Sequence, residues 1–232
     1  MKNKSIIITG AASGMGAASA RKFSKSGANV TIVDINKELA DQVTNEINAI
    51  DPIIGDIGDS SFCKKVIEST IERYGKVDVL VNCAGTILRA NAENTTDDDW
   101  HRVMSTNVNG LFFMSRAAIT PMIKNGNGVI INFGSIWGSV GSAGVVAYCA
   151  SKGAVHQITR AMALDHAKDG IRINSVCPGE VNTPMLSTGR KSPPTKEDLQ
   201  KLANETIPVA RLAEPEEVAN VVYFLASENA SY

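Results

Sequence analysis

Short runs of β-branched and other apolar residues recur along the chain, and each run ends at or beside a glycine, aspartate or asparagine. The runs are apolar on both faces, which is typical of strands buried between two layers of helices. The pattern predicts six such strands, at residues 5–9, 29–34, 52–55, 77–82, 129–133 and 171–176.

Segments with a hydrophobic period near 3.6 residues separate these runs, and this period predicts helices. The clearest segments are one around Ala40, a longer one over residues 100–112, and a late one over residues 218–225 with Pro215 in its first turn. Strands and helices alternate over residues 1–232. This order predicts the α/β class, as a single Rossmann-type domain in which a doubly wound parallel sheet carries helices on both faces.

The composition is that of an ordinary globular protein, with 44% hydrophobic and 20% charged residues among 232. The 23 basic and 24 acidic residues give a net charge of −1. A nearly neutral chain lacks the electrostatic footprint of a dedicated nucleic-acid or anionic-membrane binder, so we expect no nucleic-acid or membrane partner.

The cysteines and the N-terminus predict a soluble, cytoplasmic protein without a metal site. Cys63, Cys83, Cys149 and Cys177 form no CxxC pair and fit neither a zinc site nor a disulfide framework. The apolar run after the basic N-terminus covers only residues 6–8, which is too short for a signal peptide.

A glycine-rich turn follows the first predicted strand and precedes a helical pattern. Glycines in this position allow a tight turn and let the backbone approach a pyrophosphate at the N-terminus of the helix. The turn therefore predicts a dinucleotide-binding site formed by Gly10, Ser13, Gly14, Met15 and Gly16.

The second predicted strand ends in Asp34, 18 residues after Gly16. A carboxylate there accepts hydrogen bonds from an adenosine ribose and repels a 2′-phosphate. Ser13, Ile35 and Asn36 supply no basic side chain for that phosphate, so NAD is favoured over NADP, with Ile35 beside the adenosine. The alternative for Asp34 is an N-cap of the following helix.

The third and fourth predicted strands also end in residues suited to a ligand. Asp56 and Ile57 follow the third strand, and Asn82, Ala84 and Gly85 end the fourth. Open α/β sheets bind ligands at the carboxyl ends of their strands, so we count these residues with the cofactor site. Loop capping is the alternative for Asp56 and Ile57.

Tyr148 and Lys152 are four residues apart and therefore share one face of a helix. A phenol has a pKa near 10, which is too high for a base at neutral pH. A nearby ammonium group and an oxidised nicotinamide stabilise the phenolate and lower that pKa. The pair predicts a general acid/base that exchanges a proton with an alcohol.

Two polar residues complete the predicted catalytic set. Ser135 follows the fifth strand and precedes Tyr148 by 13 residues, so its hydroxyl is placed to hold a carbonyl oxygen. Asn107 lies on the apolar stripe of a helix, between Val103 and Leu111. A buried amide needs partners, and it either fixes the helix locally or supports a water beside the site.

Taken together and in order, these motifs resemble the short-chain dehydrogenase/reductase family. The family usually continues beyond the last helix into a further strand, whereas this sequence stops at Tyr232. Either the sequence is shortened or the sheet lacks its edge strand. The matching pieces are Thr9-Gly10-x3-Gly14-x-Gly16, Asn82-x-Ala84-Gly85, Asn107, Ser135, Tyr148-x3-Lys152 and Pro178-Gly179-x3-Thr183.

The resemblance implies a role for each matched residue. Tyr148 is the acid/base, Lys152 holds the nicotinamide ribose and tunes Tyr148, Ser135 positions the substrate oxygen, and Asn107 holds a proton-relay water. Thr183 contacts the nicotinamide carboxamide. The resemblance also implies a homo-oligomer, as a dimer or tetramer, and adds Pro178, Gly179 and Val181 to the cofactor site.

Adjacency to the catalytic residues predicts a mostly apolar substrate pocket, in which Trp137 and Met185 join Ser135 and Tyr148. The polar stretch 184–208 is a predicted substrate loop, and Thr195-x-x-Asp198 within it reads as a capping box.

The sequence thus predicts an NAD(H)-dependent oxidoreductase that interconverts a secondary alcohol and a ketone. Two alternatives stay open: a 3-oxoacyl-thioester reductase of the same family, and a protein that senses NAD(H) without turnover. Asp34 argues against the NADPH preference expected of the first. The set Ser135, Tyr148 and Lys152 argues against the second, because a sensor needs none of these side chains.

Overall fold

The computed structural model describes all residues from 1 to 232 and contains one six-stranded parallel sheet. The strand order is β3-β2-β1-β4-β5-β6, so the order reverses between β1 and β4. The strands are β1 (Ser5–Thr9), β2 (Asn29–Asp34), β3 (Ile53–Ile54), β4 (Val79–Asn82), β5 (Gly128–Phe133) and β6 (Ile171–Val176).

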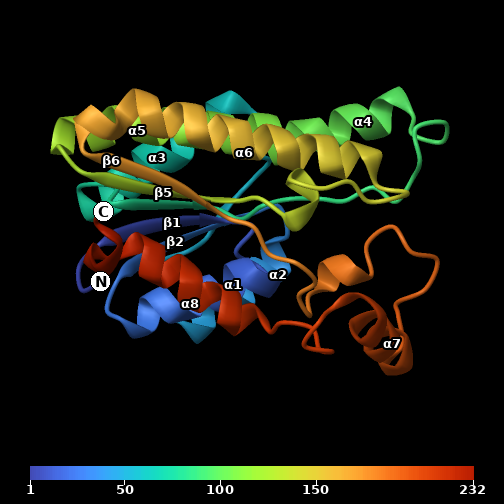
Figure 1. Ribbon diagram of the computed structural model, residues 1–232. Coiled ribbons are helices and arrows are strands. Elements are labelled where there is room, and N and C mark those ends of the chain that lie inside the picture. The colour runs from blue at the N-terminus through green and yellow to red at the C-terminus, as the bar shows by residue number, and fades with distance from the viewer.

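Helices cover both faces of the sheet. Figure 1 shows α1, α2 and α8 below the sheet, α3, α5 and α6 above it, and α7 to one side. The α-helices are α1 (Gly14–Lys25), α2 (Lys37–Glu46), α3 (Ser60–Tyr74), α4 (Asp97–Met104), α5 (Leu111–Asn125), α6 (Val146–His166), α7 (Lys196–Thr206) and α8 (Pro215–Ala226). Short helical turns complete the chain: η1 (Ser105–Gly110), η2 (Ile136–Gly138), η3 (Ala167–Asp169), η4 (Pro184–Leu186) and η5 (Glu228–Ala230).

The pleat of β1 divides the core into two parts. Ile6 and Ile8 pack with α1, α2 and α8 in one apolar cluster, whereas Ile7 packs with α3 and α5 in the other. Successive side chains of a strand point to opposite faces, so a strand between two helical layers is buried on both faces and its residues are mostly apolar. All five residues of β1 are buried, which explains the continuous apolar runs in the sequence.

The predicted α/β architecture is confirmed, and the strand ends differ by only a few residues. β3 is limited to two residues and β4 begins at Val79, later than the pattern predicts. The predicted helix over residues 100–112 is interrupted by η1, which is a π-helical turn between α4 and α5. Within this turn, Gly110 leaves room for Ile57, because a Cβ atom there would lie 2.5 Å from Ile57 Cγ1.

The carboxyl ends of the strands face one edge of the molecule, which also holds α7 and the loops after β1, β4, β5 and β6 (Figure 1). Both chain termini lie at the opposite edge. In a sheet of this kind, ligands bind beyond the carboxyl ends where the strand order reverses. The fold therefore directs attention to the loops after β1 and β4.

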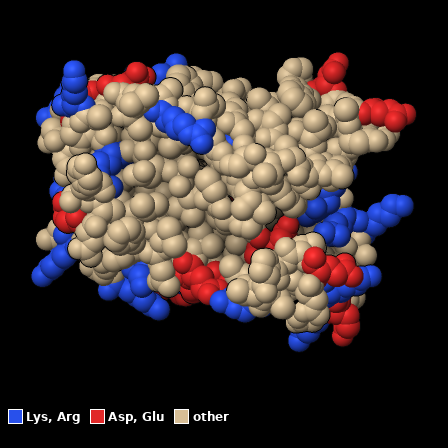
Figure 2. Space-filling model, viewed as in Figure 1, with Lys and Arg blue, Asp and Glu red and all other residues tan.

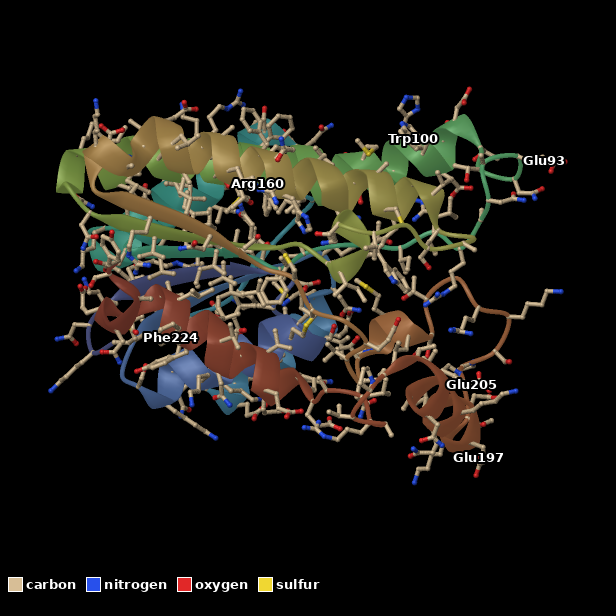
Figure 3. All side chains as sticks on the ribbon, in the orientation of Figure 1. Glu93, Trp100, Arg160, Glu197, Glu205 and Phe224 are labelled. Atoms are coloured by element: carbon tan, nitrogen blue, oxygen red, sulfur yellow. The ribbon has the colours of Figure 1, made fainter.

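Basic and acidic side chains are mixed on the face drawn in Figure 2, and no charge of one sign dominates it. Many of them gather around α7, where Glu197 and Glu205 extend away from the sheet (Figure 3). None of the helices has the length and apolar character that a membrane span requires. The structure contains no group of three or more His, Cys, Asp or Glu side chains arranged to hold a metal ion.

Candidate active site

The turn after β1 is shaped by glycines that no other residue fits. Gly10 has φ of +66°, and a Cβ atom there would lie 2.6 Å from the Cα atom of Ala84. Gly14 has φ of +52° and faces Thr183, whose Cγ2 would lie 3.2 Å from such an added atom. Positive φ and close backbone contacts both select glycine. The turn is therefore packed against the loops after β4 and β6.

The first turn of α1 has free backbone donors. Its N-cap residue, Ser13, makes no side-chain capping hydrogen bond, and no acidic side chain lies in the first turn. A helix N-terminus with unpaired N–H groups attracts an anion such as a pyrophosphate. This end of α1 opens into a cleft of about 530 Å³, which we call the larger cleft.

Most residues predicted to bind the cofactor line the larger cleft. Besides them, the wall includes Val33, Gly55, Cys83, Thr86, Arg102, Thr106, Pro184 and Met185. The predicted residues that line it are Gly10, Ser13, Gly14, Met15, Asp34, Ile35, Asp56, Ile57, Ala84, Gly85 and Thr183. The cleft spans the reversal of strand order, so its position and wall fit a dinucleotide.

Asp34 does not cap α2, so that alternative is wrong. Asn36 is the N-cap, and its Oδ1 accepts the backbone N–H of Leu39 at 3.0 Å. Asp34 instead accepts the N–H of Ala12 on Oδ2 and the N–H of Asn36 on Oδ1, both at 3.0 Å. Each carboxylate oxygen accepts more than one hydrogen bond, so Asp34 can hold the glycine-rich turn and still accept from a ribose.

Asn82 and Gly16 do not line the larger cleft themselves. The Asn82 side chain is buried and donates to Ser115 Oγ and Asn132 Oδ1, both at 2.9 Å. Asn132 in turn donates to Thr159 Oγ1 at 2.9 Å. These hydrogen bonds connect β4 and β5 to α5 and α6, so the Asn82 side chain supports the sheet.

Ile57 and Asp56, the two predicted loop residues after β3, both border the larger cleft and also contact the protein. Ile57 borders the larger cleft, but its side chain is only 5% exposed and packs on Gly110 in the core. The Asp56 carboxylate accepts the N–H of Gly58 at 2.8 Å, which is the loop-capping role left open above. Asp56 remains exposed at the cleft, so capping and ligand binding are compatible for it.

Tyr148 and Lys152 lie on successive turns of α6, and both are buried. Lys152 Nζ donates to the carbonyl oxygen of Phe133 at 2.6 Å and lies 5.5 Å from the centroid of the Tyr148 ring. The side chain of Lys152 therefore passes from α6 to the end of β5. It borders Gly85, where a Cβ atom would lie 3.7 Å from Nζ.

Burial is the largest influence on the pKa of Tyr148. Burial raises the pKa of Tyr148 to about 12, and the Ser135 hydroxyl opposes this increase. Burial lowers the pKa of Lys152 to about 8. Both shifts favour the neutral form, because an apolar environment penalises charge. The phenol therefore keeps its proton until a further positive charge arrives.

Ser135 lies in the loop after β5, two residues beyond the last residue of the strand, and it is buried. Its Oγ accepts the backbone N–H of Trp137 at 3.2 Å, as the N-cap of η2. This bond fixes the oxygen and leaves the hydroxyl proton free to donate. The same side chain borders Tyr148, so the two hydroxyl groups share one cavity.

Asn107 lies in the π-helical turn η1, and its side chain is committed to the protein. Oδ1 accepts the N–H of Thr86 at 2.8 Å, and Nδ2 donates to Thr86 O and Ser151 Oγ, both at 2.9 Å. The amide therefore has a structural role, as in the interpretation that it fixes the helix locally, and it also joins the loop after β4 to α6. π-Helical turns are frequent at functional sites. This one places Asn107 between Thr86 in the loop after β4 and Ser151 on α6.

A second cavity, of about 70 Å³, is lined by two of the four catalytic candidates, Ser135 and Tyr148, and we call it the smaller cavity. It shares Met15, Thr183 and Met185 with the larger cleft, so the two are adjacent. Both predicted substrate contacts, Trp137 and Met185, line it. Its wall consists of Met15, Ile87, Arg89, Gly134, Ser135, Ile136, Trp137, Tyr148, Pro178, Gly179, Glu180, Val181, Thr183, Met185 and Leu186.

The segment 184–208, predicted as a substrate loop, contains η4 and α7. Thr195 and Asp198 form the predicted capping box at the start of α7, and each side chain accepts the backbone N–H of the other residue. Met185 and Leu186 of this segment reach the smaller cavity. The segment is therefore ordered by its own helix and contributes one wall of the cavity.

Sequence reasoning missed His156. Its ring fills the space beside two glycines, since Cβ atoms at Gly134 and Gly138 would lie 2.5 Å from Nε2 and 2.6 Å from Cε1. Nε2 accepts the N–H of Ser135 at 3.4 Å, and Nδ1 lies 3.4 Å from Ser139 Oγ. The sequence does show a histidine one helical turn after Lys152. Only the fold shows that this histidine contacts and supports the Ser135 loop.

Known proteins match the chain over its whole length. A family model described as "Enoyl-(Acyl carrier protein) reductase" matches residues 10–232. The chain is 41% identical to meso-2,3-butanediol dehydrogenase of Serratia marcescens, over 99% of this chain and 90% of that protein. The chain belongs to the short-chain dehydrogenase/reductase family of oxidoreductases. The resemblance seen in the sequence motifs is thereby confirmed.

Other proteins are similar to this chain at 27 to 38% identity. The 3-oxoacyl-[acyl-carrier-protein] reductase FabG of Thermotoga maritima is 38% identical, over 100% of this chain and 94% of that protein. The crystal structure of 3-ketoacyl-(acyl-carrier-protein) reductase from Brucella melitensis complexed with NADH has a TM-score of 0.91 at 34% identity, covering 99% and 93% of the two chains. Levodione reductase has a TM-score of 0.94 at 27% identity, covering 100% and 93%.

Proposed function

We propose that this short-chain dehydrogenase/reductase interconverts a secondary alcohol and a ketone, with NAD(H) as cofactor and Tyr148 as the general acid/base. The observation that carries the proposal is the position of Tyr148 and Ser135 in a cavity that adjoins the larger cleft. A substrate in the cavity and a dinucleotide in the cleft would meet at the wall that both share. The similarity to a butanediol dehydrogenase supports the same reaction.

The walls of the larger cleft fit a dinucleotide. The free N–H groups at the start of α1 would hold the pyrophosphate, and Asp34 would hold the adenosine ribose. The carboxylate of Asp34 would repel a 2′-phosphate, and the basic Arg102 in the same wall is already paired with Asp99 at 2.6 Å. These contacts favour NAD over NADP. A bound nicotinamide supplies the hydride acceptor or donor.

Tyr148 and Ser135 line the smaller cavity, and Lys152 and Asn107 lie outside its wall; each of the four side chains has a distinct task. Tyr148 removes the hydroxyl proton of an alcohol or returns it to a ketone oxygen. The Ser135 hydroxyl donates to the same substrate oxygen and stabilises the charge that develops there. Lys152 is charged below its pKa of about 8 and would hold the ribose beside nicotinamide. Asn107 keeps the loop after β4 and α6 together.

Calorimetric titration with NADH and, separately, NADPH is the first test, because it needs no knowledge of the substrate. Tight binding of NADH and weak binding of NADPH are expected. Replacement Tyr148→Phe should leave NADH binding near normal and lower turnover with secondary alcohols by at least about 100-fold, the scale of a lost acid/base group. Turnover near that of the wild type in this variant contradicts the assignment of Tyr148.

A second candidate function is reduction of a 3-oxoacyl thioester, which the similarity to FabG favours. The two functions differ in substrate and cofactor preference. Faster turnover of a 3-oxoacyl thioester with NADPH than of secondary alcohols and ketones with NAD(H) would replace the first proposal by the second. A chain that binds NADH but turns over none of these compounds would support the sensor alternative.

We further propose that the chain acts in the cytoplasm as a homo-oligomer. Apolar side chains exposed on the outer helices, such as Leu164 on α6 and Phe112 on α5, support association between copies. Light scattering coupled to size-exclusion chromatography tests this, and a mass of 24.6 kDa would contradict it.

A further inference from the structure

We propose that Glu180 and Arg89 form a subsite for a second oxygen substituent, next to the carbon that reacts. The favoured substrates are then small vicinal diols and the corresponding α-hydroxyketones. This inference rests on the proposed function, because it describes the substrate of the same cavity. The subsite would make the enzyme select among secondary alcohols, which the catalytic residues alone do not do.

Glu180 is a carboxylate without a partner in the wall of the smaller cavity. It lies in the loop after β6 and is partly buried; its backbone carbonyl accepts the N–H of Ala213, whereas no protein group hydrogen-bonds to its carboxylate. Burial raises its pKa, while the more distant charges of Arg89 and Arg190 lower it. A carboxylate removed from water and left without a donor is unfavourable. A ligand that brings a hydroxyl group to this point satisfies it.

Arg89 provides donors in the same wall. Its Nε donates to the carbonyl oxygen of Thr188 at 3.0 Å, which fixes one edge of the guanidinium group. Neither Nη atom has an acceptor within the protein, and burial lowers the pKa of this arginine. A planar group held at one edge presents its remaining N–H groups in a defined direction. Arg89 is thus ready to donate to a ligand oxygen.

Both groups lie close to the reacting centre. The charge of Glu180 raises the pKa of Tyr148, and the charge of Tyr148 acts in turn on Arg89. Tyr148, Ser135, Arg89 and Glu180 all border one cavity of about 70 Å³. Glu180 and Arg89 also border a wider pocket of about 720 Å³, so they lie where the smaller cavity opens outward and can meet a second oxygen of a substrate whose first oxygen meets Tyr148.

A hydroxyl group is the substituent that matches both members of the pair, because it donates to Glu180 and accepts from Arg89. An anionic substituent would accept from Arg89 but would be repelled by Glu180. An aliphatic chain would cover Glu180 without giving it a donor. A site built around hydrogen bonds rejects the analogue that lacks them, because its own polar groups are then left unpaired. The pair therefore selects for a second hydroxyl group.

The test compares two substrates with one carbon skeleton, 2,3-butanediol and 2-butanol, in NAD-dependent oxidation. The measured quantity is the ratio of their kcat/KM values, so that a change in the pKa of Tyr148 affects both substrates and cancels. The wild type should favour the diol by about 10- to 100-fold, the scale of a hydrogen bond to a charged group. Glu180→Leu should reduce this preference by the same factor, and Arg89→Met should reduce it independently.

Glu205→Leu is the matched control, because Glu205 is an exposed glutamate on α7 that is outside the cavity (Figure 3). It should retain the preference of the wild type. If Glu180→Leu does not fold by circular dichroism, the result with Arg89→Met decides.

Three outcomes overturn the inference. A wild type that oxidises both substrates equally well contradicts the subsite but leaves the proposed function intact, and so does a variant that folds and keeps the preference. A wild type that binds NADH and oxidises neither compound nor other secondary alcohols overturns the proposed function, and the subsite with it.

Discussion

The Nζ atom of Lys152 lies 2.6 Å from the carbonyl oxygen of Phe133, the last residue of β5. Lys152 is therefore hydrogen-bonded to the sheet and not to the phenol of Tyr148, whose ring centroid is 5.5 Å away. This arrangement fixes the ammonium group at the carboxyl edge of the sheet. It also leaves the phenol protonated when no cofactor is bound, because burial raises its pKa to about 12.

Titration of the phenol should consequently depend on the cofactor. In the cofactor-free protein, the ultraviolet absorbance of the Tyr148 phenolate, obtained as wild type minus Tyr148→Phe, should appear only well above pH 10. Saturating NAD⁺ brings a positive charge and should move this titration to lower pH. Since an unfolded tyrosine has a pKa of about 10, the folded chain holds the extra proton between that value and about 12, so stability should fall as pH rises through this window. A cofactor-free titration below pH 9 contradicts this account.

Asp34→Ala should weaken the preference for NAD⁺ over NADP⁺, because the repulsion of a 2′-phosphate is removed. The variant also loses two acceptors that hold Ala12 and Asn36, so a lower melting temperature is expected. The ratio of the two specificity constants isolates the electrostatic effect and should change by about 10-fold or more, on the scale of one lost hydrogen bond to a charged group. Asp41→Ala serves as the control, since Asp41 is partly exposed and is paired with Lys37 on the surface. An unchanged ratio in Asp34→Ala means that Asp34 supports only the turn.

Gly10→Ala separates conformational strain from steric contact when it is compared with Gly144→Ala. Both glycines have positive φ, +66° and +71°, but only the Cβ atom at residue 10 would meet the backbone of Ala84. The shared φ should cost each variant about 1 to 2 kcal/mol in the free energy of unfolding. Gly10→Ala should lose more than this and bind NADH at least about 10-fold more weakly, as expected when 1.4 kcal/mol of binding free energy is lost. Urea unfolding and calorimetry measure both effects, and equal losses in the two variants would contradict the packing argument.

His156 should make the activity sensitive to acid. Burial lowers its pKa below the ordinary value of 6.5, so the folded chain keeps the ring neutral, and Nε2 can accept the N–H of Ser135. At pH values below 6.5, the histidine of the unfolded chain binds a proton more readily than His156 of the folded chain does. The stability should therefore fall as pH falls, and the Ser135 loop should loosen when the ring is protonated.

Two variants test this role of His156. His156→Gln retains an acceptor that does not titrate, so kcat should lose its decline at acid pH. His156→Phe removes the acceptor and should lower stability by about 1 kcal/mol. The exposed His101 provides the control substitution, His101→Gln, which should leave the profile unchanged. A decline at acid pH that persists in His156→Gln assigns it to another group.

The sequence predicted those features that depend on local pattern. Continuous apolar runs located the strands, because a parallel sheet between helices is buried on both faces. The capping box of Thr195 and Asp198 followed from a spacing of three residues, and it begins α7 as expected. The motif residues Gly10, Ser135, Tyr148 and Lys152 were found because each belongs to a short string with a chemical reason.

Features that depend on contacts between distant segments were not predictable in the same way. The partner of Lys152 is a backbone carbonyl, which every residue possesses, so the sequence carries no sign of it. Asn82 and Asn132 meet across two strands, and the direction of their side chains follows from the register of the sheet. The space for His156 exists because Gly134 and Gly138 have no side chains, which becomes visible only when α6 is packed on the loop.

Thr183 packs against Gly14, and Met15, Thr183 and Met185 form a wall between the larger cleft and the smaller cavity. By linkage, any effect that an occupant of one compartment has on the free energy of binding in the other is the same in both directions. Such an effect would make affinities measured for either ligand alone differ from those in the ternary complex. The difference between them measures how strongly this wall transmits occupancy.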